Sequence, residues 1–143
     1  MAVKADKDIT PLDMEAKNLI LFGESQENLI LDSVAKSNKV PVMVTNGTVN
    51  IGEKKYDLKG RGFIAIYPNP LTRPEATRSI VIYAGLNYGQ TLSINHKLDL
   101  LPDFLLYTNE ADTDHTGTNK PVVAGFFDGQ WRLNPETTWE FNP

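Results

Sequence analysis

Short apolar runs, each bounded by glycine, proline or polar residues, recur along the chain. Runs of this length are typical of strands that are buried on both faces of a sheet. Proline directly after the second run ends that strand sharply, because proline cannot continue a central hydrogen-bonded ladder. The pattern predicts strands over residues 18–22, 63–67, 79–84 and 103–107, and a late strand at a sheet edge over residues 122–127.

Two helices are predicted near the start of the chain. Thr10 can cap a short helix over residues 11–17, whose first residue is proline. Ser25 can cap a second helix, and Asn38 is a residue that commonly ends a helix in the left-handed conformation. The second helix has an apolar stripe facing inward: Ile30, Leu31, Val34 and Ala35.

A β-hairpin is the clearest local prediction. Asn46-Gly47, the favoured pair for a two-residue turn, lies between apolar segments at residues 40–44 and 48–51. A further short strand is expected over residues 55–58. The turn fixes a register in which four apolar residues share one face: Val42, Val44, Val49 and Ile51.

Strands alternating with helices favour an α/β fold. We expect a three-layer, Rossmann-like, mostly parallel sheet with the hairpin as an antiparallel insertion. Residues 1–9 are interpreted as a linker and residues 10–143 as a single α/β domain. A helix over residues 89–99 and a polar loop over residues 109–120 complete the prediction.

Composition narrows the possible functions. The 143-residue chain has a net charge of −4 and no cysteine. The charge argues against nucleic acid as a partner, and the absence of cysteine removes disulfides, thiolate metal sites and a cysteine nucleophile. No apolar run approaches the ~20 residues of a membrane span, and residues 1–8 lack the apolar region of a signal peptide. We therefore expect either a protein that is not exported or a piece of a larger one.

The segment Gly23-Glu24-Ser25-Gln26-Glu27 is the best candidate for a catalytic motif. It follows a predicted strand, as the serine of a Gly-x-Ser-x-Gly nucleophile elbow does, but Glu27 replaces the second glycine. A serine nucleophile also needs a base, and the two histidines, His96 and His115, have no spacing that ties them to Ser25. We therefore predict no catalytic residue in this chain, with Ser25 acting as a helix cap.

The polar loop contains weak candidates for metal ligands. Asp112 and Asp114 occupy the first and third positions of a calcium-loop pattern, with Gly117 at the sixth. Val123 stands where the pattern needs a bidentate glutamate, so a solvated loop explains these residues equally well. The sequence predicts no metal and no cofactor.

A small-ligand site is the remaining possibility. Open α/β sheets bind ligands beyond the carboxyl ends of their strands. On the predicted fold, residues following two buried strands would line such a pocket: Gly23, Glu24, Ser25, Tyr67 and Asn69.

Several motifs, taken in order and spacing, resemble one kind of accessory domain. They are Asn18 to Gly23, Asn28, Tyr67-Pro68-Asn69-Pro70, Leu101-Pro102-Asp103, Ala124 to Asp128, and Trp131. In these motifs the chain resembles the C-terminal domain of large bacterial proteins that combine an α/β-hydrolase domain, of prolyl oligopeptidase or esterase type, with extra modules. It is similar, more weakly, to domains of archaeal surface-layer proteins.

The resemblance implies a bacterial multidomain parent, secreted or periplasmic, whose serine-hydrolase triad lies outside this chain. It also implies that the partner is the hydrolase catalytic domain of the same parent. We therefore predict a non-catalytic accessory domain. The alternatives are a small-ligand-binding or cell-surface structural module, and a stand-alone serine hydrolase that uses Ser25.

Overall fold

The computed structural model describes residues 2–85, 102–108 and 120–141. Its elements are β1 (Leu19–Phe22), β2 (Val42–Thr45), β3 (Thr48–Ile51), β4 (Lys54–Asp57), β5 (Arg61–Pro68), β6 (Ser79–Gly85), β7 (Phe104–Thr108), β8 (Pro121–Phe127) and β9 (Leu133–Glu140), the helices α1 (Pro11–Ala16) and α2 (Leu29–Ser37), and two 3₁₀ turns, η1 (Asp6–Asp8) and η2 (Pro74–Ala76).

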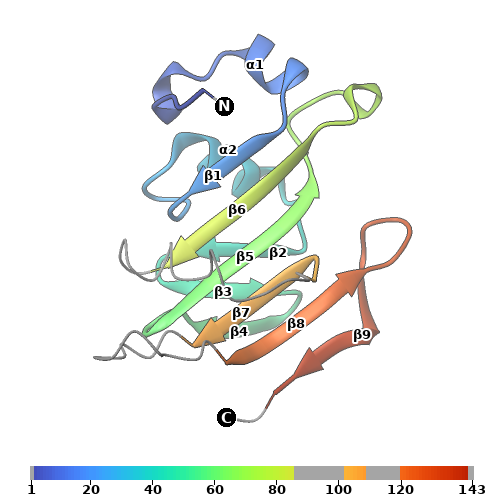
Figure 1. Cartoon of the computed structure of the whole chain (residues 1–143). Coiled ribbons are helices and arrows are strands. Elements are labelled where there is room, and N and C mark those ends of the chain that lie inside the picture. Colours follow the sequence, from blue (N-terminus) through green and yellow to red (C-terminus); the bar gives the residue numbers. More distant parts are fainter. Residues whose placement is uncertain (1, 86–101, 109–119, 142–143) are drawn as a thin grey trace.

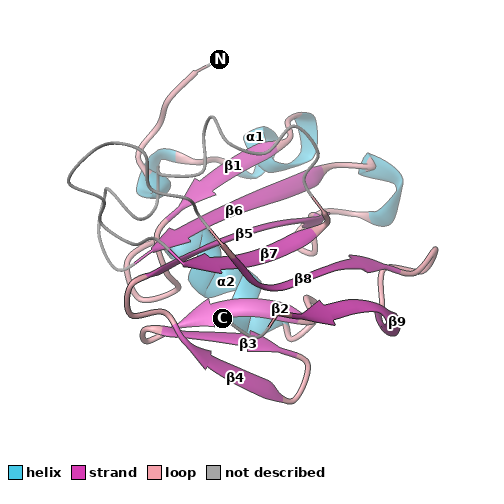
Figure 2. Cartoon of the chain, turned by 60° about the horizontal axis from the view of Figure 1, so that its bottom comes forward, coloured by secondary structure: helices cyan, strands magenta, loops and turns pink. Residues whose placement is uncertain are grey.

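Two sheets and one helix form the layers of the domain (Figure 1). The larger sheet has six strands in the order β1-β6-β5-β7-β8-β9, and the smaller sheet is the antiparallel meander β2-β3-β4. Figure 2 shows α2 and the smaller sheet on the same side of the larger one. We call this side of the six-stranded sheet the inner face and the opposite side the outer face.

The inner face holds two apolar clusters. One lies between the sheets and joins β2 and β3 to the middle of the large sheet, through residues such as Val44, Phe63 and Phe104. The other packs β1 and β6 against α2, with Leu31 fully buried at its centre. A third, smaller cluster lies on the outer face around Ile64 and Leu105.

The predicted α/β, Rossmann-like fold with a mostly parallel sheet is wrong. Within the described ranges α1 and α2 are the α-helices, and β1 with β6 is the parallel pair; the other strand pairs are antiparallel. The prediction failed because an apolar run reports burial on both faces but not strand direction. Here the centre of the sheet is buried on both faces although its strands are antiparallel, as Ile64 and Leu105 show on the outer face.

The local predictions fared better. The hairpin has its predicted register, with Val44 opposite Val49 and Val42 opposite Ile51, and Asn46 and Gly47 both have positive φ. Thr10 forms a full capping box at the start of α1, and Asn38 ends α2 at φ 53°.

Two local predictions are corrected. The cap of α2 is Asn28, whose Oδ1 accepts from two backbone N–H groups, and not Ser25. Strand β8 is not an edge, because the tail folds back as β9 and pairs with it. The expected helix over residues 89–99 lies outside the described residues, as does nearly all of the loop over 109–120. Over the described ranges, no helix is long and apolar enough to cross a membrane.

Candidate binding edge along strand β1

The predicted ligand-pocket residues do not come together. Gly23 follows β1 and donates its N–H to the Tyr83 carbonyl near the carboxyl end of β6, at 2.9 Å. Asn69 follows β5 and donates its N–H to the Arg78 carbonyl, just before β6 begins, at 2.7 Å. Because β5 is antiparallel to β6, the two groups lie at opposite ends of the sheet.

The segment of residues 23–27, which resembles a nucleophile elbow in sequence, forms hydrogen bonds with the hairpin of β2 and β3. The Glu24 side chain is 3% exposed, and its Oε2 accepts from the Gly47 N–H at 2.6 Å. Glu27 accepts from the Glu24 N–H through Oε2, which lies 3.2 Å from where a Cβ on Gly23 would stand. The Ser25 backbone N–H donates to the Val44 carbonyl. Glu24, Glu27 and the backbone N–H of Ser25 therefore have structural roles. The Ser25 hydroxyl donates to Gln26 Oε1 at 3.5 Å.

Several candidate residues lie outside the described residues: His96, His115, Asp112 and Asp114. Among the described residues no three acidic, histidine or cysteine side chains gather in a way that could hold a metal ion.

Tyr67 and Asn69 support the opposite end of the sheet. The Tyr67 hydroxyl donates to the Trp131 carbonyl at 2.8 Å, and its ring makes edge contacts with Phe127 and Trp131. Burial raises the pKa of the Tyr67 hydroxyl, with the charge of Asp128 adding to the effect. Asn69 is buried, and its Oδ1 accepts from the following turn at the Leu71 N–H.

Strand β1 has an open edge that sequence reasoning missed. In a parallel ladder the hydrogen bonds to one neighbour come from every second residue. The bond from the Gly23 N–H to Tyr83 shows that Leu19, Leu21 and Gly23 face β6. The backbone groups of Ile20 and Phe22 therefore point away from the sheet.

Little occupies these outward groups in the described part of the chain. The Phe22 carbonyl accepts from the Asn28 side-chain amide at 3.2 Å. No described residue pairs with the N–H or carbonyl of Ile20, or with the N–H of Phe22. The edge therefore offers two donors and one acceptor in a row.

The side chains of β1 alternate between burial and exposure. Leu19 and Leu21 are buried against α2. Ile20 and Phe22 lie on the outer face and are 45% and 50% exposed, and the Phe22 ring stacks on Tyr83 at 5.5 Å between ring centres. The open edge is therefore apolar as well as unpaired.

A groove of about 550 Å³ follows this edge. Its far wall is the segment of residues 2–17, which we call the N-terminal arm and which lies beside β1 in Figure 1. Apolar side chains from the arm, β1 and α2 line it, among them Val3, Ile9, Leu19 and Ile30. The groove can therefore take apolar side chains next to the unpaired backbone.

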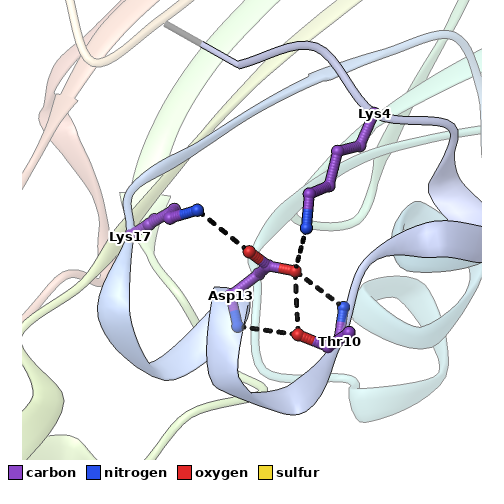
Figure 3. A network of polar contacts seen from close by, with 4 residues as sticks. All are labelled: Lys4, Thr10, Asp13 and Lys17. Carbon is purple, nitrogen blue, oxygen red and sulfur yellow. Dashed lines mark hydrogen bonds and ion pairs between the residues drawn. The ribbon is translucent and has the colours of Figure 1, made fainter.

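A carboxylate at the centre of the arm holds it in shape (Figure 3). Asp13 accepts from Lys4 Nζ at 2.7 Å, from Lys17 Nζ at 3.0 Å and from the Thr10 N–H at 3.1 Å. The hydrogen bond from the Lys4 ammonium is the largest of the effects that hold the pKa of Asp13 far below its usual range. The hydrogen bonds of Asp13 therefore hold the N-terminal arm in a defined conformation where it lines the groove.

A second carboxylate ties the arm to α2. Asp6 Oδ2 accepts from the Leu29 N–H at 2.7 Å, and its Oδ1 accepts from the Lys7 N–H at 2.8 Å. The bond from Leu29, at the positive N-terminus of α2, is the main reason that the pKa of Asp6 is lowered.

The charges along the groove are separated. The ammonium groups of Lys4 and Lys17 share the single Asp13 carboxylate, so the three groups together carry one net positive charge. Lys17 lies two residues before Leu19, where β1 begins. Asp6 lies at the start of α2, where the neighbouring Asn28 binds the last carbonyl of β1. Among the residues that line the groove, the ammonium groups of Lys4 and Lys17 therefore lie near the start of β1 and the carboxylate of Asp6 lies near its end.

Fold and edge together define a mainly β domain in which the unpaired edge of β1 lies beside an apolar groove. No family model, curated protein or solved structure matches the chain. The resemblance to accessory domains of bacterial hydrolases stays a prediction.

Proposed function

We propose that the chain is a non-catalytic protein-interaction domain that docks a partner at the open edge of β1. The observation that carries the proposal is the row of unpaired backbone groups on Ile20 and Phe22, next to the apolar groove. Such a row is a template for another strand, because main-chain hydrogen bonds give affinity and neighbouring pockets give specificity.

The non-catalytic part of the proposal rests on the roles of the candidate residues. The side chains of Glu24 and Glu27, with the backbone N–H of Ser25, bind the hairpin and shape the turn after β1. The resemblance to accessory modules supports a partner in the same parent protein, namely its hydrolase domain.

Selection from a random heptapeptide display library tests the docking proposal without a known partner. We expect enriched peptides that bind the wild-type chain and lose binding to Ile20→Pro. Proline removes the outward N–H of Ile20 but none of the hydrogen bonds between β1 and β6. Ile20→Val is the matched control, since it keeps the N–H and should keep binding.

The outcome against docking is equally definite. If no peptide is enriched, or if enriched peptides bind Ile20→Pro as well as the wild type, the edge is not the binding site. Circular dichroism and denaturant unfolding of both variants show that the fold is retained.

A hydrolysis panel tests the non-catalytic proposal. Activated esters and short peptides should be left unchanged by the wild-type chain and by Ser25→Ala. Turnover by the wild type that disappears in Ser25→Ala would make the chain an enzyme and overturn the proposal.

A further inference from the structure

We propose that the edge of β1 takes an extended, apolar peptide segment that runs antiparallel to β1 and places a carboxylate against Lys4 and Lys17. This inference rests on the proposed docking function and specifies the chemistry and direction of the docked segment. Three features of the groove carry it: the unpaired backbone, the apolar lining on both sides of the edge, and the separated charges.

The backbone sets the conformation of the segment. Ile20 offers an N–H and a carbonyl in the same direction, and Phe22 offers a further N–H. Only an extended chain presents acceptors and donors at the matching spacing of two residues, about 6.6 Å. A folded domain can use this edge only through an extended strand of its own.

The lining sets the composition. Side chains of an added strand would alternate between the outer face, beside Ile20 and Phe22, and the inner side, beside Ile9 and Ile30. Both positions are apolar, and half-exposed side chains on β1 gain burial when covered. The segment is therefore apolar or β-branched at successive positions.

The charges set the direction. Each ammonium of the Lys4–Asp13–Lys17 group spends one hydrogen bond on Asp13 and has further N–H groups to donate. The side chains of Lys4 and Lys17 are 37% and 55% exposed, so a ligand can reach them. A carboxylate there receives charge-assisted hydrogen bonds, which are roughly twice as strong as neutral ones.

This ammonium pair lies beside the start of β1, and an antiparallel segment ends there. The carboxylate must therefore follow the apolar part of the segment, as an acidic side chain or a chain terminus. A parallel segment would bring the same carboxylate toward Asp6, where like charges repel.

A set of synthetic peptides tests direction and charge. The first probe is acetyl-Thr-Val-Thr-Val-Thr-Val-Glu-amide, the second has Gln in place of Glu, and the third has the reversed sequence with Glu first. Calorimetry or fluorescence anisotropy should show the first probe binding about tenfold more tightly than the second and the third.

Lysine variants connect this difference to the proposed residues. Lys17→Gln, and separately Lys4→Gln, should weaken the Glu probe and leave the Gln probe unchanged. Lys36→Gln is the matched control, because Lys36 pairs with Asp32 on α2 and does not line the groove. It should change neither affinity.

N-methylation tests the ladder itself. Methylating the Val nitrogens in one peptide and the Thr nitrogens in another removes donors on opposite edges of the added strand. One of the two peptides should lose binding and the other should keep it, because only one edge faces β1. Equal effects of the two sets would show apolar adhesion rather than strand addition and overturn the inference.

The two proposals fail in different ways. Equal binding of the Glu, Gln and reversed probes would overturn the proposed charge and direction while edge-dependent binding still supported docking. If the Glu probe does not bind while display-selected peptides bind the wild type and not Ile20→Pro, only this inference is overturned. Absence of any edge-dependent peptide would remove the proposed function as well.

Discussion

The two outer edges of the six-stranded sheet are built in opposite ways. Strand β9 is irregular: its pairing with β8 shifts register between Gly125 and Phe127, and Pro135 lies within it. The Thr137 hydroxyl donates to the Phe126 carbonyl at 2.7 Å, so a side chain contributes to the pairing of this edge. Bulges and proline are common means of preventing unwanted strand addition.

Strand β1 has none of these features. It is a regular four-residue strand with an unbroken register from Leu19 to Phe22, and its exposed side chains are Ile20 and Phe22. An unpaired, regular and apolar edge is a template for pairing with another chain. The contrast within one sheet therefore supports a binding role for β1.

The largest expected effect separates the two faces of β1. Leu21→Ala should lower the free energy of unfolding by about 3 kcal/mol, because Leu21 is buried against α2 and its loss leaves a cavity. Phe22→Ala, on the exposed face, should cost about 1 kcal/mol or less and should weaken peptide binding. Urea unfolding compares the two; equal costs would mean that Phe22 belongs to the core.

The next largest effect concerns the packing of β8 beside β9, the irregular edge strand, which we call the protected edge. Gly125→Ala would place a Cβ 2.3 Å from Phe104 Cζ and 2.9 Å from the Thr137 carbonyl oxygen. Such overpacking should destabilise the domain by about 2 kcal/mol, again measured by urea unfolding.

Gly129→Ala is the matched control, since nothing lies within 4 Å of the added Cβ. It should change the stability by less than about 0.5 kcal/mol. If the two variants were equally stable, the close packing of β8 on β7 and β9 would be contradicted.

These regions also show what the sequence could and could not predict. The cap of α1 and the hairpin turn were predicted correctly, because Thr10 and Asn46-Gly47 act through neighbouring residues. The cap of α2 was assigned to Ser25 instead of Asn28, because both residues suit the position. The direction of the strands was not predicted correctly, since the apolar run in β5 fits a parallel or an antiparallel neighbour equally well. Strand β9 was missed because it is polar apart from Leu133 and Trp139.

The candidate site was missed for a related reason. An edge is defined by the strand that fails to pair with it, and no local pattern around Ile20 reports that. The only available signal was Lys17-Asn18 beside an apolar run preceded by a capped helix, which is too general to indicate a groove. The predicted pocket around Gly23 and Asn69 depended on strand direction, so it could not be right while the fold was wrong.

A smaller effect tests the arm that walls the open edge. Thr10→Ala removes the side-chain acceptor of the Asp13 N–H and should destabilise α1 by about 1 kcal/mol. Hydrogen exchange should then speed up in residues 11–16 and stay unchanged in β5. Faster exchange throughout the sheet would contradict the expectation that the N-terminal arm opens independently of the sheet.

Acid should loosen the same arm. The pKa of Asp13 is lower in the folded chain than its ordinary value of 3.8, so its contribution is present above that value and is lost as the pH falls below it. Exchange in residues 11–16 should therefore rise below about pH 4. Asp13→Asn should reduce this dependence, and the part that comes from Asp6, whose pKa is also lowered, should remain.

The smallest effect lies at the end of the protected edge, where Glu140 joins β9 to the smaller sheet. Glu140 Oε1 accepts from Lys54 Nζ and from the Tyr56 hydroxyl, each at 2.5 Å. Burial, followed by the bond to Glu140, raises the pKa of Tyr56 to about 12. Because the folded pKa is above the ordinary value of 10.0, the contribution of Tyr56 to stability is complete below pH 10 and is lost as the pH rises through about 12.

Glu140→Gln should move the pKa of Tyr56 down toward 10.0 but not all the way, since burial is the larger cause and remains. Titration of tyrosinate absorbance, with Tyr56→Phe to assign the signal, measures the change. Glu136→Gln is a control on the same strand, because neither Lys54 nor Tyr56 bonds to Glu136. An unchanged pKa in Glu140→Gln would mean that Glu140 does not hold β9 to the smaller sheet, and the contrast between the two edges would then rest on the bulge and Pro135 alone.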